Sequence, residues 1–69
     1  MSVYRVTEVI GTSTESWEAA ARSAVETAAA TVRELRVAEV LRKDVTIENG
    51  QVTGYRVRLA ISFKYNAEV

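Results

Sequence analysis

The segment Ile47-Glu48-Asn49-Gly50-Gln51-Val52 determines how the second half of this chain folds. A two-residue type I′ turn needs positive φ at both central positions, and Asn-Gly is a pair that adopts this geometry readily. Segments rich in β-branched and aromatic side chains flank the turn on both sides. We therefore predict two antiparallel strands, residues 36–48 and 51–65, joined by a tight hairpin.

The segment 51–65 alternates most regularly between apolar and polar side chains, which is typical of a strand with one buried face. One face carries Tyr55, Val57, Leu59, Ile61, Phe63 and Tyr65, and the other carries Arg56, Arg58, Ala60, Ser62 and Lys64. We place this strand at the centre of the sheet. In the strand 36–48 the apolar residues change face between Val40 and Leu41, which indicates a β-bulge or two halves with different neighbours.

The first half of the chain predicts a strand at residues 3–10, ended by Gly11, and then a helix from residue 15 to about 35. Ser13 or Thr14 is the expected N-cap, because a hydroxyl there accepts a hydrogen bond from an unpaired backbone N–H group. The helix has an apolar stripe at steps of three and four, made of Trp17, Ala20, Ala21, Ala24, Val25, Ala28, Val32 and Leu35.

The element order predicts an α+β fold of one domain, residues 1–69, in which a three-stranded antiparallel sheet wraps on one helix. The helix covers one face of the sheet and leaves the face with Arg56, Arg58 and Lys64 uncovered. A 69-residue chain has little core, and this one has no cysteine for disulfides and no histidine for a metal site of the usual kind. We therefore expect the chain to be stabilised by assembly with copies of itself.

Composition excludes several classes of function. Nine basic and nine acidic side chains give no net charge, so we expect no nucleic-acid partner. No apolar run is long enough to span a membrane, and the N-terminus lacks the features of a signal peptide, so we expect a soluble cytoplasmic protein. Without histidine or cysteine, the usual general base and thiol nucleophile are missing, and we expect no enzyme.

Few residues stand out as candidates for a binding site. Glu39 lies between apolar neighbours, which predicts either a cross-strand ion pair with Arg56 or a place at an interface. Gly11-Thr12-Ser13 is expected to open the helix, where N–H groups hold a phosphate or are simply capped. Trp17 is expected in the core or at an interface, and secondarily as a stacking platform. The acidic stretch Asp44, Glu48 and Asn49 is too sparse for a calcium loop, unless copies around a symmetry axis combine their oxygens.

The residues resemble the dodecin family. The resemblance covers nearly the whole chain and is carried by Val-Tyr-Arg-Val-Thr-Glu-Val-Ile-Gly-Thr-Ser at 3–13, by the helix to Thr31-Val32, by Val37-Ala38-Glu39-Val40, and by Tyr55-Arg56-Val57 through Ser62-Phe63. It implies a hollow homododecamer that stores or buffers a flavin, such as FMN or riboflavin, bound in stacked pairs.

Two positions differ from the flavin-binding members of that family. Their second-strand tryptophan is replaced here by Val37, and their third-strand glutamine is replaced by Arg56. Ser16-Trp17 and Arg36-Val37-Ala38 are more similar to a subgroup described as calcium-binding dodecins. The resemblance thus implies a small-ligand-binding dodecamer of the flavin-storage type or, alternatively, a flavin-independent shell that binds calcium or another ligand. In both cases we expect Val37, Glu39 and Arg56 to form the ligand-binding face.

Overall fold

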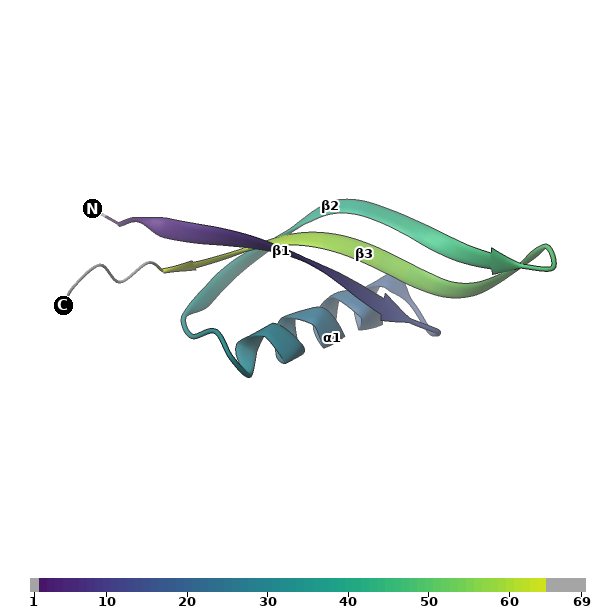
Figure 1. The fold of residues 1–69 in the computed structure, drawn as a ribbon, viewed down its shortest axis with the longest axis horizontal. Helices are drawn as coiled ribbons and strands as arrows, with labels where there is room; N and C mark the ends of the chain where they lie inside the picture. Colours follow the sequence, from purple (N-terminus) through teal and green to yellow (C-terminus); the bar gives the residue numbers. More distant parts are fainter. Residues whose placement is uncertain (1, 65–69) are drawn as a thin grey trace.

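The computed structural model of the protein describes residues 2–64 and has four elements. They are β1 (Tyr4–Ser13), α1 (Trp17–Ala29), β2 (Leu35–Glu48) and β3 (Gln51–Lys64). β3 is the central strand, and it pairs antiparallel with β1 on one side and β2 on the other (Figure 1). The predicted β-α-β-β architecture and the central place of the third strand are confirmed.

The hairpin between β2 and β3 forms as predicted. Asn49 and Gly50 have φ values of 53° and 76°, and Glu48 pairs with Gln51 directly beside them. The register of β2 against β3 shifts at three places, and one shift lies between Val40 and Arg42. This is the predicted β-bulge, with Leu41 as the extra residue.

The core lies between α1 and the inner face of the sheet (Figure 1). Among the described residues, the buried hydrophobic side chains are Ala20, Ala24, Val57, Leu59 and Ile61. Two of these five are alanines, so the buried apolar area is small, and β3 supplies all the large side chains. The face of β3 predicted to be buried is therefore the one that α1 covers, although Tyr65, also predicted on this face, lies outside the described residues.

We predicted that the first strand ends at Gly11, but β1 continues to Ser13. A Cβ atom at Gly11 would lie 2.3 Å from the backbone oxygen of Ala20 and 2.8 Å from Cβ of Ala24. Glycine is needed here because α1 crosses β1 at close range, not because the chain turns. The alanines on α1 serve the same close approach.

The helix is shorter than predicted at both ends. It begins at Trp17, and Ser16 is the N-cap whose Oγ accepts a hydrogen bond from the N–H of Ala19 at 2.9 Å. Ser13 instead accepts the N–H of Glu15 in a local turn. At the other end the helix stops at Ala29, and residues 30–34 connect it to β2. Leu35, which we predicted in the helix, pairs in β2, and the backbone oxygen of Glu34 accepts the N–H of Lys64 at 3.1 Å.

The face of the sheet that points away from α1, here called the open face, is uncovered in the described chain (Figure 1). Large hydrophobic side chains remain 43–63% exposed across the described residues: Val3, Tyr4, Val6, Ile10, Val37, Val40, Leu41, Ile47 and Val52. The hairpin also extends beyond the end of α1, in a molecule whose extents are 53 × 20 × 14 Å. Within residues 2–64, the helix is neither long nor apolar enough to cross a membrane.

Candidate functional site on the open face

The structure places Val37, Glu39 and Arg56 on the open face, but it does not bring all three together. Val37 is opposite Ser62 and Glu39 is opposite Ala60. Arg56 lies four residues along β3 from Ala60, which corresponds to about 13 Å at the usual rise of a strand. The predicted ion pair between Glu39 and Arg56 is therefore wrong.

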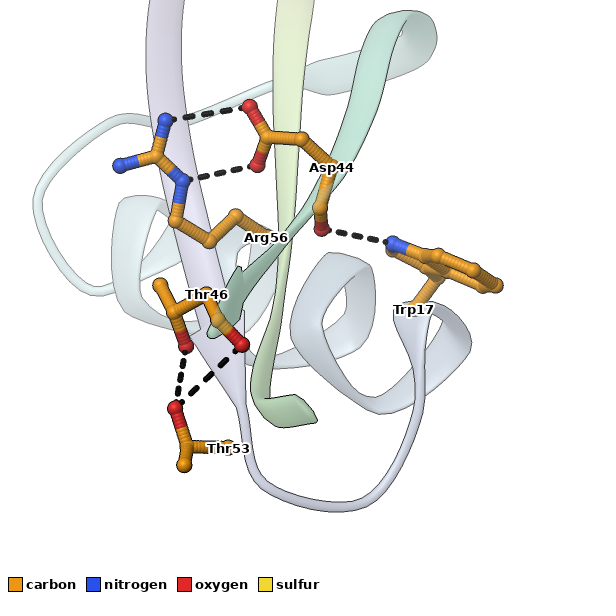
Figure 2. A network of polar contacts seen from close by, with 5 residues as sticks. All are labelled: Trp17, Asp44, Thr46, Thr53 and Arg56. Atoms are coloured by element: carbon orange, nitrogen blue, oxygen red, sulfur yellow. Dashed lines mark hydrogen bonds and ion pairs between the residues drawn. The ribbon is translucent and has the colours of Figure 1, made fainter. Parts of the chain in front are cut away.

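The partner of Arg56 is Asp44, which stands directly opposite it on β2. The guanidinium donates from Nε to Oδ1 at 2.8 Å and from Nη2 to Oδ2 at 3.1 Å, so the pair is bidentate (Figure 2). The hydrogen bonds from Arg56 lower the pKa of Asp44, and the charges of Arg56, Arg42 and Arg58 act in the same direction against partial desolvation. Both oxygens of the Asp44 carboxylate are thus occupied by one arginine.

Asp44 also connects the sheet to the start of α1. Its backbone oxygen accepts a hydrogen bond from Nε1 of Trp17 at 3.0 Å (Figure 2). The Trp17 ring meets Tyr55 edge to face, with 5.2 Å between ring centroids, and Nζ of Lys43 lies 5.6 Å from the Trp17 centroid. Trp17 is half-buried and packs against the core. The prediction of a core or interface position describes it better than that of a stacking platform.

A group of arginines around Asp44 was not predicted from the sequence. Arg42 stands directly opposite Arg58 in the register of β2 and β3, next to the Asp44–Arg56 pair. Strict alternation from Val37 assigns Arg42 and Asp44 to the other face of the strand. The bulge at Leu41 adds one residue, so both side chains move to the open face. The sequence pattern already showed a change of face between Val40 and Leu41. Applying that change to the residues that follow would have predicted Arg42 and Asp44 on the open face.

Close to the hairpin, two hydroxyl groups join β2 and β3 across the sheet. Oγ1 of Thr46 and Oγ1 of Thr53 are 2.9 Å apart, and the Thr53 hydroxyl also lies 3.3 Å from the backbone oxygen of Thr46 (Figure 2). These hydrogen bonds link β2 and β3 at the exposed end of the hairpin, and each hydroxyl group is the partner of the other. They present no unpaired group to a ligand.

One described chain alone does not fit a metal ion or a stacked flavin. Over residues 2–64, no three acidic side chains come close enough together to hold a metal, whereas calcium takes six to eight oxygens. Val37 is 62% exposed and offers no aromatic ring to a flavin, and Arg56 is held by Asp44. Gly11-Thr12-Ser13 belongs to β1 and does not open the helix, so neither of its two predicted roles, a phosphate site or the helix cap, is found there.

Comparisons with known proteins point to one family. The family model described as Dodecin matches residues 3–66. The chain is 45% identical over 64 residues to the calcium dodecin of Mycobacterium tuberculosis, which covers 93% of this chain and 90% of that protein. Among solved structures, the dodecin from Streptomyces coelicolor superposes with a TM-score of 0.91 at 40% identity, covering 97% of this chain and 96% of that one.

A second solved structure shares both fold and sequence with this chain. It is the calcium-chelating immunodominant antigen of Mycobacterium tuberculosis, a calcium dodecin described as having a novel calcium-binding site. Its TM-score is 0.82 at 42% identity, and the match covers 99% of this chain and 97% of that one. The superposition therefore spans the helix and all three strands.

Proposed function

Because the chain belongs to the dodecin family, we propose that it is a homododecameric binding protein that takes up calcium between subunits and does not stack flavin. Dodecins are non-enzymatic binding proteins, so family membership confirms the expectation that this chain is not an enzyme. The remaining parts of the proposal concern assembly, the choice of ligand and the residues that bind it.

Assembly is supported by what a single chain leaves uncovered. Within residues 2–64, the core contains three large fully buried side chains, Val57, Leu59 and Ile61. The open face and the projecting hairpin expose apolar residues such as Val6, Ile47 and Val52. A core this small seldom provides more than about 3–5 kcal/mol on its own. Contacts between copies would remove these side chains from water and supply the missing stabilisation.

The exposed Val37 on the open face is the observation that carries the choice of calcium over flavin. A valine has no π-face, so a ring bound there would lack the stacking that aromatic side chains provide. Arg56 is engaged with both oxygens of Asp44 and does not replace an amide that donates and accepts at a ring edge. The 45% identity with a calcium dodecin favours the ion.

We keep Val37, Glu39 and Arg56 as the proposed ligand-binding residues, with different roles. Glu39 is exposed on the open face and makes no ion pair within residues 2–64, so its carboxylate is the available oxygen ligand. Copies of Glu39 that meet at a symmetry axis would combine the oxygens that one chain lacks. Val37 lies next to Glu39 on the same face, and Arg56 fixes Asp44.

The test combines assembly state and two ligands. We expect native mass spectrometry to show twelve copies, calcium but not magnesium to raise the melting temperature, and riboflavin fluorescence to stay unchanged at micromolar protein. Glu39→Gln should abolish the calcium effect, while Glu26→Gln, at an exposed helix position, should keep it. Strong riboflavin quenching, or no calcium effect on the wild type, would overturn the choice of ligand. A calcium effect that Glu39→Gln leaves intact would overturn Glu39 as the residue that binds it.

A further inference from the structure

Three arginines lie close together on the open face. Arg42 and Arg58 stand directly opposite each other on β2 and β3, and Arg56 lies two residues from Arg58 on the same face. Like charges directly opposite on neighbouring strands destabilise a sheet. The arrangement therefore costs stability unless a negative group lies between the arginines.

The carboxylates nearby do not balance the three arginines. Asp44 accepts one hydrogen bond at each carboxylate oxygen from Arg56, so its charge is paired with that arginine. Glu8 approaches Arg58 only to 3.9 Å, between side chains that are 58% and 53% exposed, so this contact is weak. Arg42 makes no hydrogen bond or ion pair within residues 2–64, although its charge acts on Asp44. Three cations thus face two carboxylates, and the guanidinium of Arg42 keeps all its donors available.

These side chains surround a depression in the open face. It has a volume of about 100 Å³ and is lined by Ile10, Arg42, Asp44, Arg56, Val57 and Arg58. A tetrahedral oxyanion fits in such a space, and guanidinium groups match the geometry of phosphate and carboxylate oxygens because they donate in a planar fork. The Asp44 bond holds Arg56 in place, so one wall of the depression is already ordered before any ligand arrives.

We propose that Arg42, Arg56 and Arg58 bind a small oxyanion, namely the phosphate group of a small-molecule ligand, on the open face of each chain. Arg42 and Arg58 clamp the anion from opposite strands, and Arg56 adds positive charge from its fixed position. All residues of the site come from one chain, so the proposal goes beyond the proposed calcium function and does not depend on it.

The test uses inorganic phosphate as the probe, on the full chain in its assembled state. Isothermal titration calorimetry should show saturable binding of one phosphate per chain. A thermal melt should show that phosphate raises the melting temperature. Arg42→Gln should weaken binding by at least about tenfold, as expected for a lost charge-assisted hydrogen bond. Arg22→Gln, an exposed arginine on α1, should leave the affinity unchanged and serves as the matched control.

Arg58→Gln is the second variant, and it should also weaken phosphate binding. It keeps the test available if Arg42→Gln does not fold. Absence of saturable phosphate binding to the wild-type chain at millimolar concentrations would overturn the proposal. It would equally be overturned if phosphate has no effect while Arg42→Gln dissociates the assembly, since the arginines then serve a carboxylate of a neighbouring copy. Calcium binding is measured separately with Glu39→Gln, so failure of one site does not imply failure of the other.

Discussion

Replacing Gly11 with alanine tests whether the close contact between α1 and β1 holds this fold together. A Cβ atom at this position would lie 2.3 Å from the backbone oxygen of Ala20 and 2.8 Å from Cβ of Ala24. Carbon and oxygen normally approach to about 3.3 Å. The helix would therefore have to move by roughly 1 Å at Ala20, a backbone position that no side-chain rotation can relieve.

The expected cost follows from that displacement. Overpacking of a well-packed interior typically costs about 1–3 kcal/mol. Ala20 is fully buried and Ala24 nearly so, and both lie on the turns of α1 that contact the sheet, so we expect the upper end of this range. A change of about 3 kcal/mol corresponds to a fall in melting temperature of more than about 10 °C for a domain of this size. Circular dichroism at a fixed chain concentration measures it.

Gly54→Ala is the matched control. The nearest atom to its Cβ would be Oγ1 of Thr46 at 2.9 Å, and the next is 3.7 Å away. The Thr46 side chain is exposed and rotates away at the cost of its hydrogen bond to Thr53. We expect a change within about 1 kcal/mol, because alanine also restricts the unfolded chain. If Gly11→Ala melts at the same temperature as Gly54→Ala and the wild type, the helix does not depend on this contact and the reasoning is wrong.

Three further predictions concern the core, the ligand and pH. Ala24→Glu places a carboxylate in the contact between α1 and β1 and should abolish folding altogether, so a soluble folded monomer, seen by circular dichroism and native mass, would contradict it. Val37→Trp should strengthen riboflavin binding roughly 5- to 150-fold, from about 1–3 kcal/mol of stacking, whereas Val37→Leu should not; equal fluorescence quenching by both would refute this. For Asp44, hydrogen bonds from Arg56 hold the pKa below its ordinary value of 3.8. The wild type should melt above Asp44→Asn at neutral pH, and the difference should disappear as pH falls below 3.8 through the folded-state pKa; a difference constant down to pH 2 would exclude the linkage.

The parts of the fold that could be predicted are those governed by local backbone chemistry and by strict alternation. Asn49-Gly50 specifies a turn with positive φ, and the alternating pattern of β3 identifies a strand with one buried face. Both properties depend on neighbours in sequence, so they can be read without tertiary contacts. The central position of β3 follows from the same pattern.

The element boundaries could not be predicted because contacts distant in sequence set them. Gly11 looked like the end of a strand, but α1 requires the missing side chain there and the strand continues. Leu35 continued the apolar stripe of the helix, yet pairing with Phe63 draws it into β2. Because β1 extends to Ser13, the helix begins later than predicted and Ser16 provides the capping hydroxyl. In each case a tertiary contact overrode the local preference.

The candidate site depends on the bulge at Leu41 more than on any single side chain. If Leu41 occupied a regular position in the ladder instead of the bulge, Arg42 and Asp44 would point toward α1, where their charges would lose water without a matching partner, at a large cost in free energy. With the bulge, Val40 stays opposite Leu59 on the side of the helix, while Asp44 meets Arg56 on the open face. A change of one residue in register therefore places Val40 on the side of the helix and Arg42 and Asp44 on the open face. The same change sets the charge of the open face, where we propose that the ligand binds.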